Sequence, residues 1–314
     1  MNVVAEAQRL AGAGRRAEGV ALVERAAAAG DQEALLALAY WRLYGVEGPR
    51  DPAAAHELLD RAASLGSLEA ARLRAALSAN GTGCASDPGR ARGMLEALAA
   101  SDAAARAQVD LLDAMDEGRR QEEQLCVDPP LRLVRALFSA QECGYLIEAA
   151  TPAMRPSVII DPVTRRPRPD PLRTSDGTNF GPAQEDPVIH ALNRRIAAAT
   201  GTLVECGEPL HILRYSPGQQ YRPHLDAVPG ASNQRVLTAL VYLNEGYEGG
   251  ETAFPELDIA AKGGVGDALL FANVGPDGRT DQRTRHAGLP IEAGVKWLAT
   301  RWIRARPYDP FAPG

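Results

Sequence analysis

Lysine is scarce in this sequence. Of thirty-four lysine and arginine residues, only two are lysine, Lys262 and Lys296. Aromatic residues make up 5% of the chain, and the net charge at neutral pH is −6. Binding to nucleic acid or to an anionic membrane surface requires clustered positive charge. We therefore expect neither partner, and the two lysines stand out as exceptions in an arginine-rich chain.

The cysteines and the apolar segments limit the cellular setting. Cys84, Cys126, Cys143 and Cys206 form no Cys-x-x-Cys pair and no regular framework, which favours reduced thiols in a cytosolic protein. The amino terminus has no charged segment followed by an apolar one. No apolar run approaches the roughly 18 residues that span a membrane. We therefore expect a cytoplasmic protein with no membrane partner.

The first third of the chain repeats itself with a period of thirty-six residues. Asp51-Pro52 recurs as Asp87-Pro88, each in a position suited to an N-cap followed by proline at the first helical position. Alanine-rich helical segments surround these pairs, and equivalent turns are expected at Gly30, Gly66 and Asp102. A period of this length is typical of a helical solenoid whose units stabilise one another by stacking.

The length of 314 residues suggests about two domains. We assign residues 1–118 to two or three helical repeats, 119–130 to a linker, and 131–314 to a second domain. The repeats resemble Sel1-like repeats, relatives of the tetratricopeptide class. Such arrays present a concave surface to another protein, but three units could equally form a cap that packs against the second domain.

Three residues in the second domain have the chemistry of a metal site. His224 and Asp226 are separated by one residue, so on a strand both side chains would point to the same face. His286 follows sixty residues later and could supply a third ligand from another strand. Two histidines and one carboxylate form a facial triad that leaves coordination positions open and suits Fe(II) in oxygen chemistry.

A strand is expected at residues 296–303, which are rich in β-branched and aromatic side chains. Lys296, Leu298, Thr300 and Trp302 would share one face of it. If that face lines a barrel, the Lys296 ammonium is partly desolvated and requires an anionic partner. A bound carboxylate would provide it.

Several stretches, taken in order, give the second domain a resemblance to a known family. They are Arg173-Thr174-Ser175-Asp176-Gly177-Thr178, Leu213-Arg214-Tyr215, Pro217-Gly218-Gln219-Gln220-Tyr221, Arg235-Val236-Leu237-Thr238 through Tyr242-Leu243, Gly249-Gly250-Glu251-Thr252, Gly266-Asp267-Ala268-Leu269-Leu270-Phe271 and His286-Ala287-Gly288. With the His-x-Asp pair and the Lys296 strand, the segment from about residue 131 to 306 resembles the prolyl 4-hydroxylase-type Fe(II)/2-oxoglutarate dioxygenases.

The resemblance implies roles for individual residues. It implies Fe(II) ligands His224, Asp226 and His286, with Lys296 binding the distal carboxylate of 2-oxoglutarate. The same carboxylate would be held by Tyr215 and Thr252. Positions near a peptide substrate are matched by Arg173, Tyr221, Arg235 and Trp302. The sequence departs from the family pattern at Leu289, where many members have cysteine, and at Arg304, where some have histidine.

The resemblance also implies the fold and the reaction. We expect an α+β multidomain protein in which the helical repeats precede a double-stranded β-helix, or jelly-roll barrel, with flanking helices and a core at about 207–306. The implied activity is hydroxylation of a prolyl residue in a protein or peptide. The implied cofactor is Fe(II), and the implied co-substrates are 2-oxoglutarate and O₂. Succinate and CO₂ are the co-products, and L-ascorbate is the expected reductant.

Two alternatives remain open from the sequence. A hydroxylase with the same cofactors could act on another side chain, a free amino acid or a small metabolite. A protein of a different class, a non-catalytic repeat-bearing adaptor, could sense iron, O₂ or 2-oxoglutarate. The sequence does not determine the substrate, the hydroxylated carbon and its stereochemistry, the oligomeric state, or whether the repeats recruit a partner that carries the substrate peptide.

Overall fold

The computed structural model describes residues 2–116, 118, 120–160, 167–169 and 172–311. It divides into two compact units. Unit 1 comprises residues 1–115 together with 182–191, and unit 2 comprises 116–181 and 192–314. Each unit has its own arrangement of secondary structure and its own buried core.

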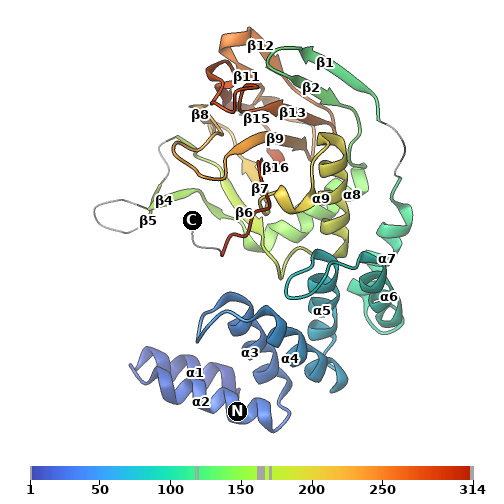
Figure 1. Cartoon of the computed structure of the whole chain (residues 1–314), viewed down its shortest axis with the longest axis vertical. Coiled ribbons are helices and arrows are strands. Elements are labelled where there is room, and N and C mark those ends of the chain that lie inside the picture. Colours follow the sequence, from blue (N-terminus) through green and yellow to red (C-terminus); the bar gives the residue numbers. More distant parts are fainter. Residues whose placement is uncertain (1, 117, 119, 161–166, 170–171, 312–314) are drawn as a thin grey trace. The chain divides into compact units, whose positions relative to one another are not determined.

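Unit 1 is built from antiparallel helix pairs, as the repeat predicted (Figure 1). Alanine and leucine side chains of the first five helices form one buried core, and side chains of the last three form a second, smaller one. The small alanines allow the helices to approach closely. The helices are α1 (Val3–Gly12), α2 (Arg16–Ala28), α3 (Gln32–Tyr44), α4 (Pro52–Ser64), α5 (Leu68–Asn80), α6 (Pro88–Leu98) and α7 (Ala103–Ala114).

The predicted helix starts are confirmed. The Asp51 and Asp87 side chains accept hydrogen bonds from the backbone N–H groups of Ala54 and Arg90, and a proline follows each aspartate. The third predicted turn, at Asp102, is present between α6 and α7 but is offset by one residue. Asp102 is itself the N-cap of α7, because this unit is one residue shorter than the two before it.

A short segment distant in sequence completes unit 1. The Asn80 side-chain amide donates to the carbonyl oxygens of Pro182 and Glu185, at 2.9 and 3.0 Å. The backbone N–H of Ala183 donates to the Tyr44 hydroxyl at 3.4 Å, and the Ala183 side chain packs against the helical core. Tyr44 and Asn80 end the second helices of successive repeats and are thirty-six residues apart.

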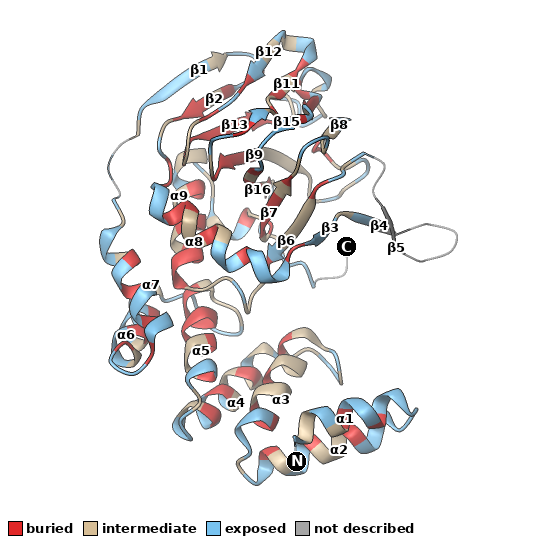
Figure 2. Ribbon diagram, turned by 180° about the vertical axis from the view of Figure 1, so that it is seen from behind, coloured by how far each residue is buried: buried red, intermediate tan, exposed pale blue. Residues whose placement is uncertain are grey.

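Unit 2 is organised around an eight-stranded antiparallel sheet. Its central strands are almost fully buried, which explains their continuous apolar sequences (Figure 2). In spatial order the strands are β1 (Glu122–Cys126), β2 (Leu131–Val134), β13 (Ala268–Ala272), β9 (Arg235–Tyr242), β16 (Lys296–Arg304), β7 (Leu210–Tyr215), β6 (Asp176–Phe180) and β3 (Arg155–Pro156).

A four-stranded antiparallel sheet forms the second layer, and two short two-stranded ladders complete the strands of this unit. Large apolar side chains from the two sheets, including Tyr242 and Phe271 from the larger and Phe254 from the smaller, share one core. The smaller sheet is β12 (Ile259–Ala261), β11 (Thr252–Phe254), β14 (His286–Gly288) and β8 (Tyr221–His224), and the ladders are β10 (Glu248–Gly249) with β15 (Ile291–Ala293) and β4 (Val158–Ile160) with β5 (Pro167–Pro169). The predicted jelly-roll fold is confirmed.

Helices α8 (Ala140–Ala150) and α9 (Pro187–Thr200) flank the larger sheet (Figure 2). A capping box between Ser139 and Glu142 begins α8, and the buried Glu142 carboxylate accepts a 2.7 Å bond from Arg195 of α9. Short 3₁₀ turns lie at Thr151–Ala153, Val204–Cys206, Pro255–Leu257 and Gln282–Thr284. Within the described residues, every helix is too short or too polar to cross a lipid bilayer.

The segment 119–130, assigned from sequence to a linker, contains structure of its own. β1 lies within it and pairs with β2 at the edge of the larger sheet. Unit 2 accordingly begins at Asp116, and residues 182–191 belong with the helical repeats although they follow β6 in the sequence.

Candidate active site

A pocket of about 510 Å³, counting the part open to solvent, lies between the two sheets of unit 2. Every predicted site residue except Arg235 lines it. Its walls are mainly apolar, with side chains such as Leu240, Ile291 and Leu298 between the polar groups. The pocket therefore provides a water-poor space in which a few charged groups are concentrated.

The two predicted histidine ligands lie on neighbouring strands of the smaller sheet. His224 ends β8 and is directly opposite His286, which begins β14. In each ring Nδ1 bonds the backbone carbonyl oxygen two residues earlier, Arg222 at 2.9 Å and Thr284 at 3.0 Å. A ring whose Nδ1–H is used in this way presents the unprotonated Nε2 as a ligand atom.

Asp226 reaches the site differently from the prediction. Strand β8 ends at His224, so Asp226 lies in the turn after the strand and its direction does not follow from strand alternation. The Thr238 hydroxyl, on β9, donates to Asp226 Oδ2 at 2.7 Å. Asn273 Nδ2 donates to the Thr238 oxygen at 2.9 Å. Asn273 Oδ1 is a second acceptor for the Thr238 hydroxyl at 3.3 Å, so the shorter contact with Asp226 is the stronger of the two.

The three side chains have the geometry and charge of a metal site. The distance from Asp226 Oδ1 to His224 Nε2 is 3.6 Å, that from Oδ2 to His286 Nε2 is 3.8 Å, and the three donor atoms lie within 4.8 Å of one another. Burial lowers the pKa of His286 to about 4, although Asp226 opposes this change, so its ring is neutral at pH 7. Burial alone would raise the pKa of Asp226, but His286 and His224 lower it well below its usual range. The donors fit a divalent cation with open positions.

Lys296 lies at the other end of the pocket. Its side chain is 3% exposed, and Nζ donates to the Gly250 carbonyl oxygen at 2.7 Å. Burial lowers the pKa of Lys296 to about 8, with Glu251 opposing the change, so the ammonium remains charged at pH 7. A buried ammonium with one carbonyl partner retains donors for a carboxylate.

Tyr215 and Thr252 lie beside this ammonium. Tyr215, on β7, is directly opposite Lys296 in the register of β7 and β16, and burial raises the pKa of its hydroxyl. Thr252 begins β11 and shares a 3.2 Å hydrogen bond with the Tyr242 hydroxyl. All three predicted co-substrate residues thus converge on one end of the pocket, as a dicarboxylate requires.

Tyr221 and Arg173 line the pocket on the side of His224. The Tyr221 ring stacks on the His224 imidazole with ring centroids 3.5 Å apart. The Arg173 guanidinium carbon lies 5.5 Å from the Tyr221 ring centroid, and the two residues form an isolated β-bridge. This pair places a flat, partly cationic wall next to the proposed metal.

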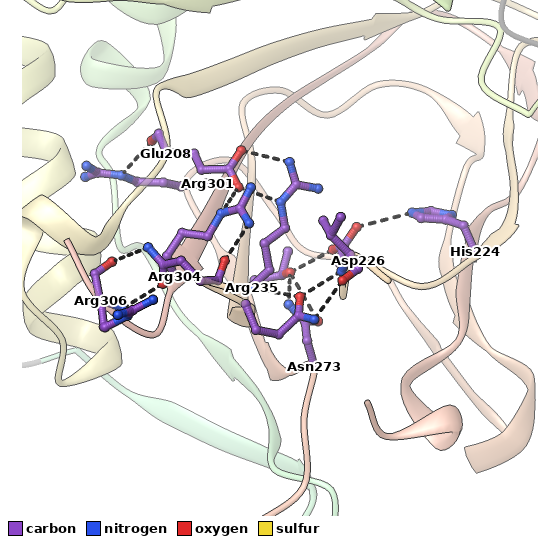
Figure 3. Close-up of polar contacts among 12 residues, drawn as sticks. Glu208, His224, Asp226, Arg235, Asn273, Arg301, Arg304 and Arg306 are labelled. Atoms are coloured by element: carbon purple, nitrogen blue, oxygen red, sulfur yellow. Dashed lines mark hydrogen bonds and ion pairs between the residues drawn. The ribbon is translucent and has the colours of Figure 1, made fainter. Parts of the chain in front are cut away.

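Trp302 lines another wall of the pocket, and the Arg235 guanidinium packs against the Trp302 ring. The Arg235 guanidinium carbon lies 3.9 Å from a Trp302 ring centroid. The same guanidinium forms two hydrogen bonds with the buried Glu208 carboxylate, at 2.5 and 2.8 Å (Figure 3). Arg304 Nε also pairs with Glu208, at 2.6 Å. Arg235 therefore holds the wall and does not itself line the pocket, and Arg304 joins the same ion-pair cluster.

Thr238, Asn273 and Glu208 are site residues that the sequence did not reveal. Thr238 and Asn273 orient the carboxylate ligand, and Glu208 fixes the arginines behind Trp302. For Thr238, strand alternation was the one available signal: on β9 it shares a face with Leu240, which lines the pocket. For Asn273 and Glu208 the positions depend on strands that come together only in the fold.

A jelly-roll barrel that brings two histidines and a carboxylate together opposite a buried lysine defines an Fe(II)- and 2-oxoglutarate-dependent dioxygenase. Residues 210–304 match the family model of the 2OG-Fe(II) oxygenase superfamily. This matched region contains every residue of the metal and lysine ends of the pocket.

Comparison with individual proteins identifies the family within this superfamily to which the chain is similar. The chain is 36% identical over 205 residues to probable prolyl 4-hydroxylase 10 of Arabidopsis thaliana. This alignment covers 58% of this chain and 71% of the relative. It is also 34% identical over 208 residues to prolyl 4-hydroxylase 1 of the same plant, in an alignment that covers 60% of this chain and 74% of that relative. A solved structure of the viral collagen prolyl hydroxylase from Paramecium Bursaria Chlorella virus-1, in complex with 2OG, shows 31% identity, covers 56% of this chain and 96% of that one, and has a TM-score of 0.46. The chain belongs to the prolyl 4-hydroxylase family.

Proposed function

We propose that this protein hydroxylates a prolyl residue in a protein or peptide and converts 2-oxoglutarate and O₂ to succinate and CO₂. One observation carries the proposal: the His224, Asp226 and His286 donor atoms and the Lys296 ammonium line one largely apolar pocket. The names of the relatives in Arabidopsis support the prolyl substrate.

Different residues of the pocket would bind the metal, bind the co-substrate and exclude water. Bound iron and 2-oxoglutarate would supply the oxidising chemistry, and the protein supplies position and an environment poor in water. His224, Asp226 and His286 would hold the metal, while Lys296 would pair with the distal carboxylate of 2-oxoglutarate, assisted by Tyr215 and Thr252. The apolar walls between them exclude water from the reacting groups.

The substrate would enter on the side of Tyr221 and Trp302. Within the described residues, the buried Nε1 of Trp302 and Oγ1 of Thr300 have no hydrogen-bond partner, and both residues line the pocket. Unpaired buried donors favour a ligand that brings acceptors, and the carbonyl groups beside a prolyl ring are acceptors with no competing N–H on the proline. We assign these two residues, with Arg173 and Tyr221, to substrate binding.

The test begins with purified full-length protein mixed anaerobically with Fe(II) and 2-oxoglutarate. We expect the visible metal-to-ligand charge-transfer band, succinate after O₂ is admitted, and neither in Asp226→Ala. Proline-containing peptides should raise succinate formation and gain one oxygen atom on proline, and ascorbate should sustain turnover. Iron-loaded protein that gives no band and no succinate would support the adaptor function. Succinate stimulated by amino acids or small metabolites and not by peptides would shift the substrate class.

For unit 1 we propose Sel1-like repeats that bind the protein carrying the substrate peptide. The surface beside Tyr44 and Asn80 is already used by residues 182–186 of the same chain. A groove of about 570 Å³ between α1, α2 and α3, lined by Trp41 and Val20, is the candidate binding surface. Val20→Glu should weaken binding of a substrate protein while leaving turnover of a short peptide unchanged, and equal effects on both would contradict recruitment.

We propose a cytoplasmic location for the protein. The support is chemical: the side chains of Cys84, Cys126, Cys143 and Cys206 are all free thiols. Reduced cysteines are the usual state in the cytosol. Fractionation of cells that express the tagged protein tests this location, and recovery in an exported fraction would contradict it.

A further inference from the structure

The two lysines of the chain donate to the same short loop, Lys296 from β16 and Lys262 from the residue just after β12. Inside the pocket, Lys296 Nζ donates to the Gly250 carbonyl at 2.7 Å. Lys262 follows β12 and is exposed to solvent. Its Nζ donates to the carbonyl oxygens of Tyr247 and Gly249, at 3.0 and 3.2 Å. The loop 247–250, which includes the two-residue strand β10, is therefore bound by both cations.

The conformation of this loop depends on its two glycines. Gly249 and Gly250 both have left-handed backbone angles, with φ of +70° and +71°. A Cβ on Gly250 would lie 2.4 Å from Ile291 Cδ1 and 3.4 Å from Lys296 Cδ, so the backbone approaches the pocket more closely than any other residue would allow. The carbonyl of Gly249 is then free to meet Lys262 while that of Gly250 meets Lys296.

We propose that Lys262 is a positioning residue for the co-substrate end of the site. By holding the carbonyls of Tyr247 and Gly249, it fixes the direction of the next carbonyl, that of Gly250, and through it the Lys296 ammonium. The inference deepens the proposed function, because it takes Lys296 as the group that binds the distal carboxylate of 2-oxoglutarate.

The chemistry of lysine suits this position. The Lys262 ammonium lies 4.4 Å from the Tyr247 ring centroid while it bonds two carbonyl oxygens. A compact ammonium can direct its three donors to such differently placed partners, whereas the donors of a guanidinium lie in one plane. This requirement accounts for lysine at residue 262 in a chain whose other basic residues, Lys296 excepted, are arginine.

The test compares Lys262→Met with a matched control, Arg279→Met, which removes another exposed cation of the same unit. In Lys262→Met we expect 2-oxoglutarate to bind about three- to tenfold more weakly, with a matching rise in its Michaelis constant, the usual effect of losing a charge-assisted hydrogen bond. The kcat for succinate and the Fe(II) affinity should stay within about twofold of wild type. Lys262→Arg should fall between wild type and Lys262→Met.

Hydrogen exchange separates this inference from the proposed function. Without co-substrate, the amides of residues 244–251 should exchange faster in Lys262→Met than in wild type or Arg279→Met. Unchanged exchange, or unchanged 2-oxoglutarate affinity in an active enzyme, would overturn the positioning role. Parallel losses of Fe(II) and 2-oxoglutarate affinity would also overturn it, because they indicate general damage to the fold. Wild-type protein without a charge-transfer band and succinate would instead contradict the proposed function.

Discussion

The two ends of the pocket are held in place by different means. At the metal end, each histidine is oriented by the carbonyl two residues before it, so the partner is local in sequence. At the co-substrate end, Lys296 bonds Gly250, forty-six residues away, in a loop to which Lys262, just after β12, also donates. The two histidines are thus oriented by backbone groups next to them in the sequence. Asp226 and Lys296 instead depend on partners that the fold brings from distant segments.

Removal of the carboxylate ligand should have the largest effect. Asp226→Ala deletes the only acidic donor of the triad, and we expect a loss of Fe(II) affinity beyond the roughly 10–100-fold typical of changes in supporting residues. The charge-transfer band and succinate production should disappear. Asp226→Glu, which keeps the charge but displaces it by one methylene, should retain part of the Fe(II) affinity. An alanine variant that still makes succinate would refute the assignment of Asp226.

Asp226 is the exception to local positioning, and Thr238→Val tests it. Valine keeps the shape of threonine but leaves the Asp226 oxygen without its 2.7 Å donor. We expect Fe(II) affinity to fall about 10–100-fold. Thr238→Ser is the matched control and should stay near wild type, since it keeps the hydroxyl. Equal Fe(II) affinities in the valine and serine variants, measured by anaerobic titration, would show that the turn alone positions the carboxylate.

The co-substrate end should respond to pH between 7 and 9 through the charge of Lys296. Glu251, Lys262, Tyr215 and Tyr242 are the charged and titratable groups around Lys296, whose pKa is about 8. As pH rises from 7 to 9 the ammonium loses its proton in the free enzyme, so 2-oxoglutarate should bind about tenfold more weakly.

Lys296→Arg provides the control for this pH dependence. Its guanidinium stays charged, so its affinity for 2-oxoglutarate, although lower at pH 7, should not change between pH 7 and 9. Anaerobic titration followed by the charge-transfer band gives both curves. A wild-type affinity that is flat over this range would contradict the role of the Lys296 charge.

The smallest effect is expected from a helix cap in unit 1. Asp51→Ala removes the side-chain acceptor at the start of α4 and should lower the free energy of unfolding by about 1 kcal/mol. Fe(II) and 2-oxoglutarate affinities should be unchanged, because neither end of the pocket includes this helix. Thermal unfolding measures the stability, and a change in either affinity would show that the pocket depends on the repeats.

Sequence patterns predicted the parts of the structure that local rules control. The Asp-Pro pairs located helix starts because an N-cap and its proline act within one turn. The strand at Lys296 followed from its richness in β-branched and aromatic residues. The prediction that Asp226 lies on a strand was wrong, since the strand ends two residues earlier and a hydroxyl from β9 directs the carboxylate.

The rest required contacts between distant segments. Nothing near Arg235 in sequence indicates that its guanidinium is held by Glu208 and stacks on Trp302 instead of lining the pocket. Likewise, the contact of residues 182–186 with Asn80 joins positions about a hundred residues apart. Such pairings have no sequence period, so a pattern cannot reveal them.

The sequence by itself determined the helical repeats, the presence of the strand at Lys296, and which histidines, aspartate and lysine are the candidate site residues, because capping, strand composition and ligand chemistry act over a few residues. Only the tertiary structure decided how the Asp226 carboxylate is oriented, which wall Arg235 supports, and that both lysines bind one loop. These features depend on strands that become neighbours when the two sheets close around their shared core.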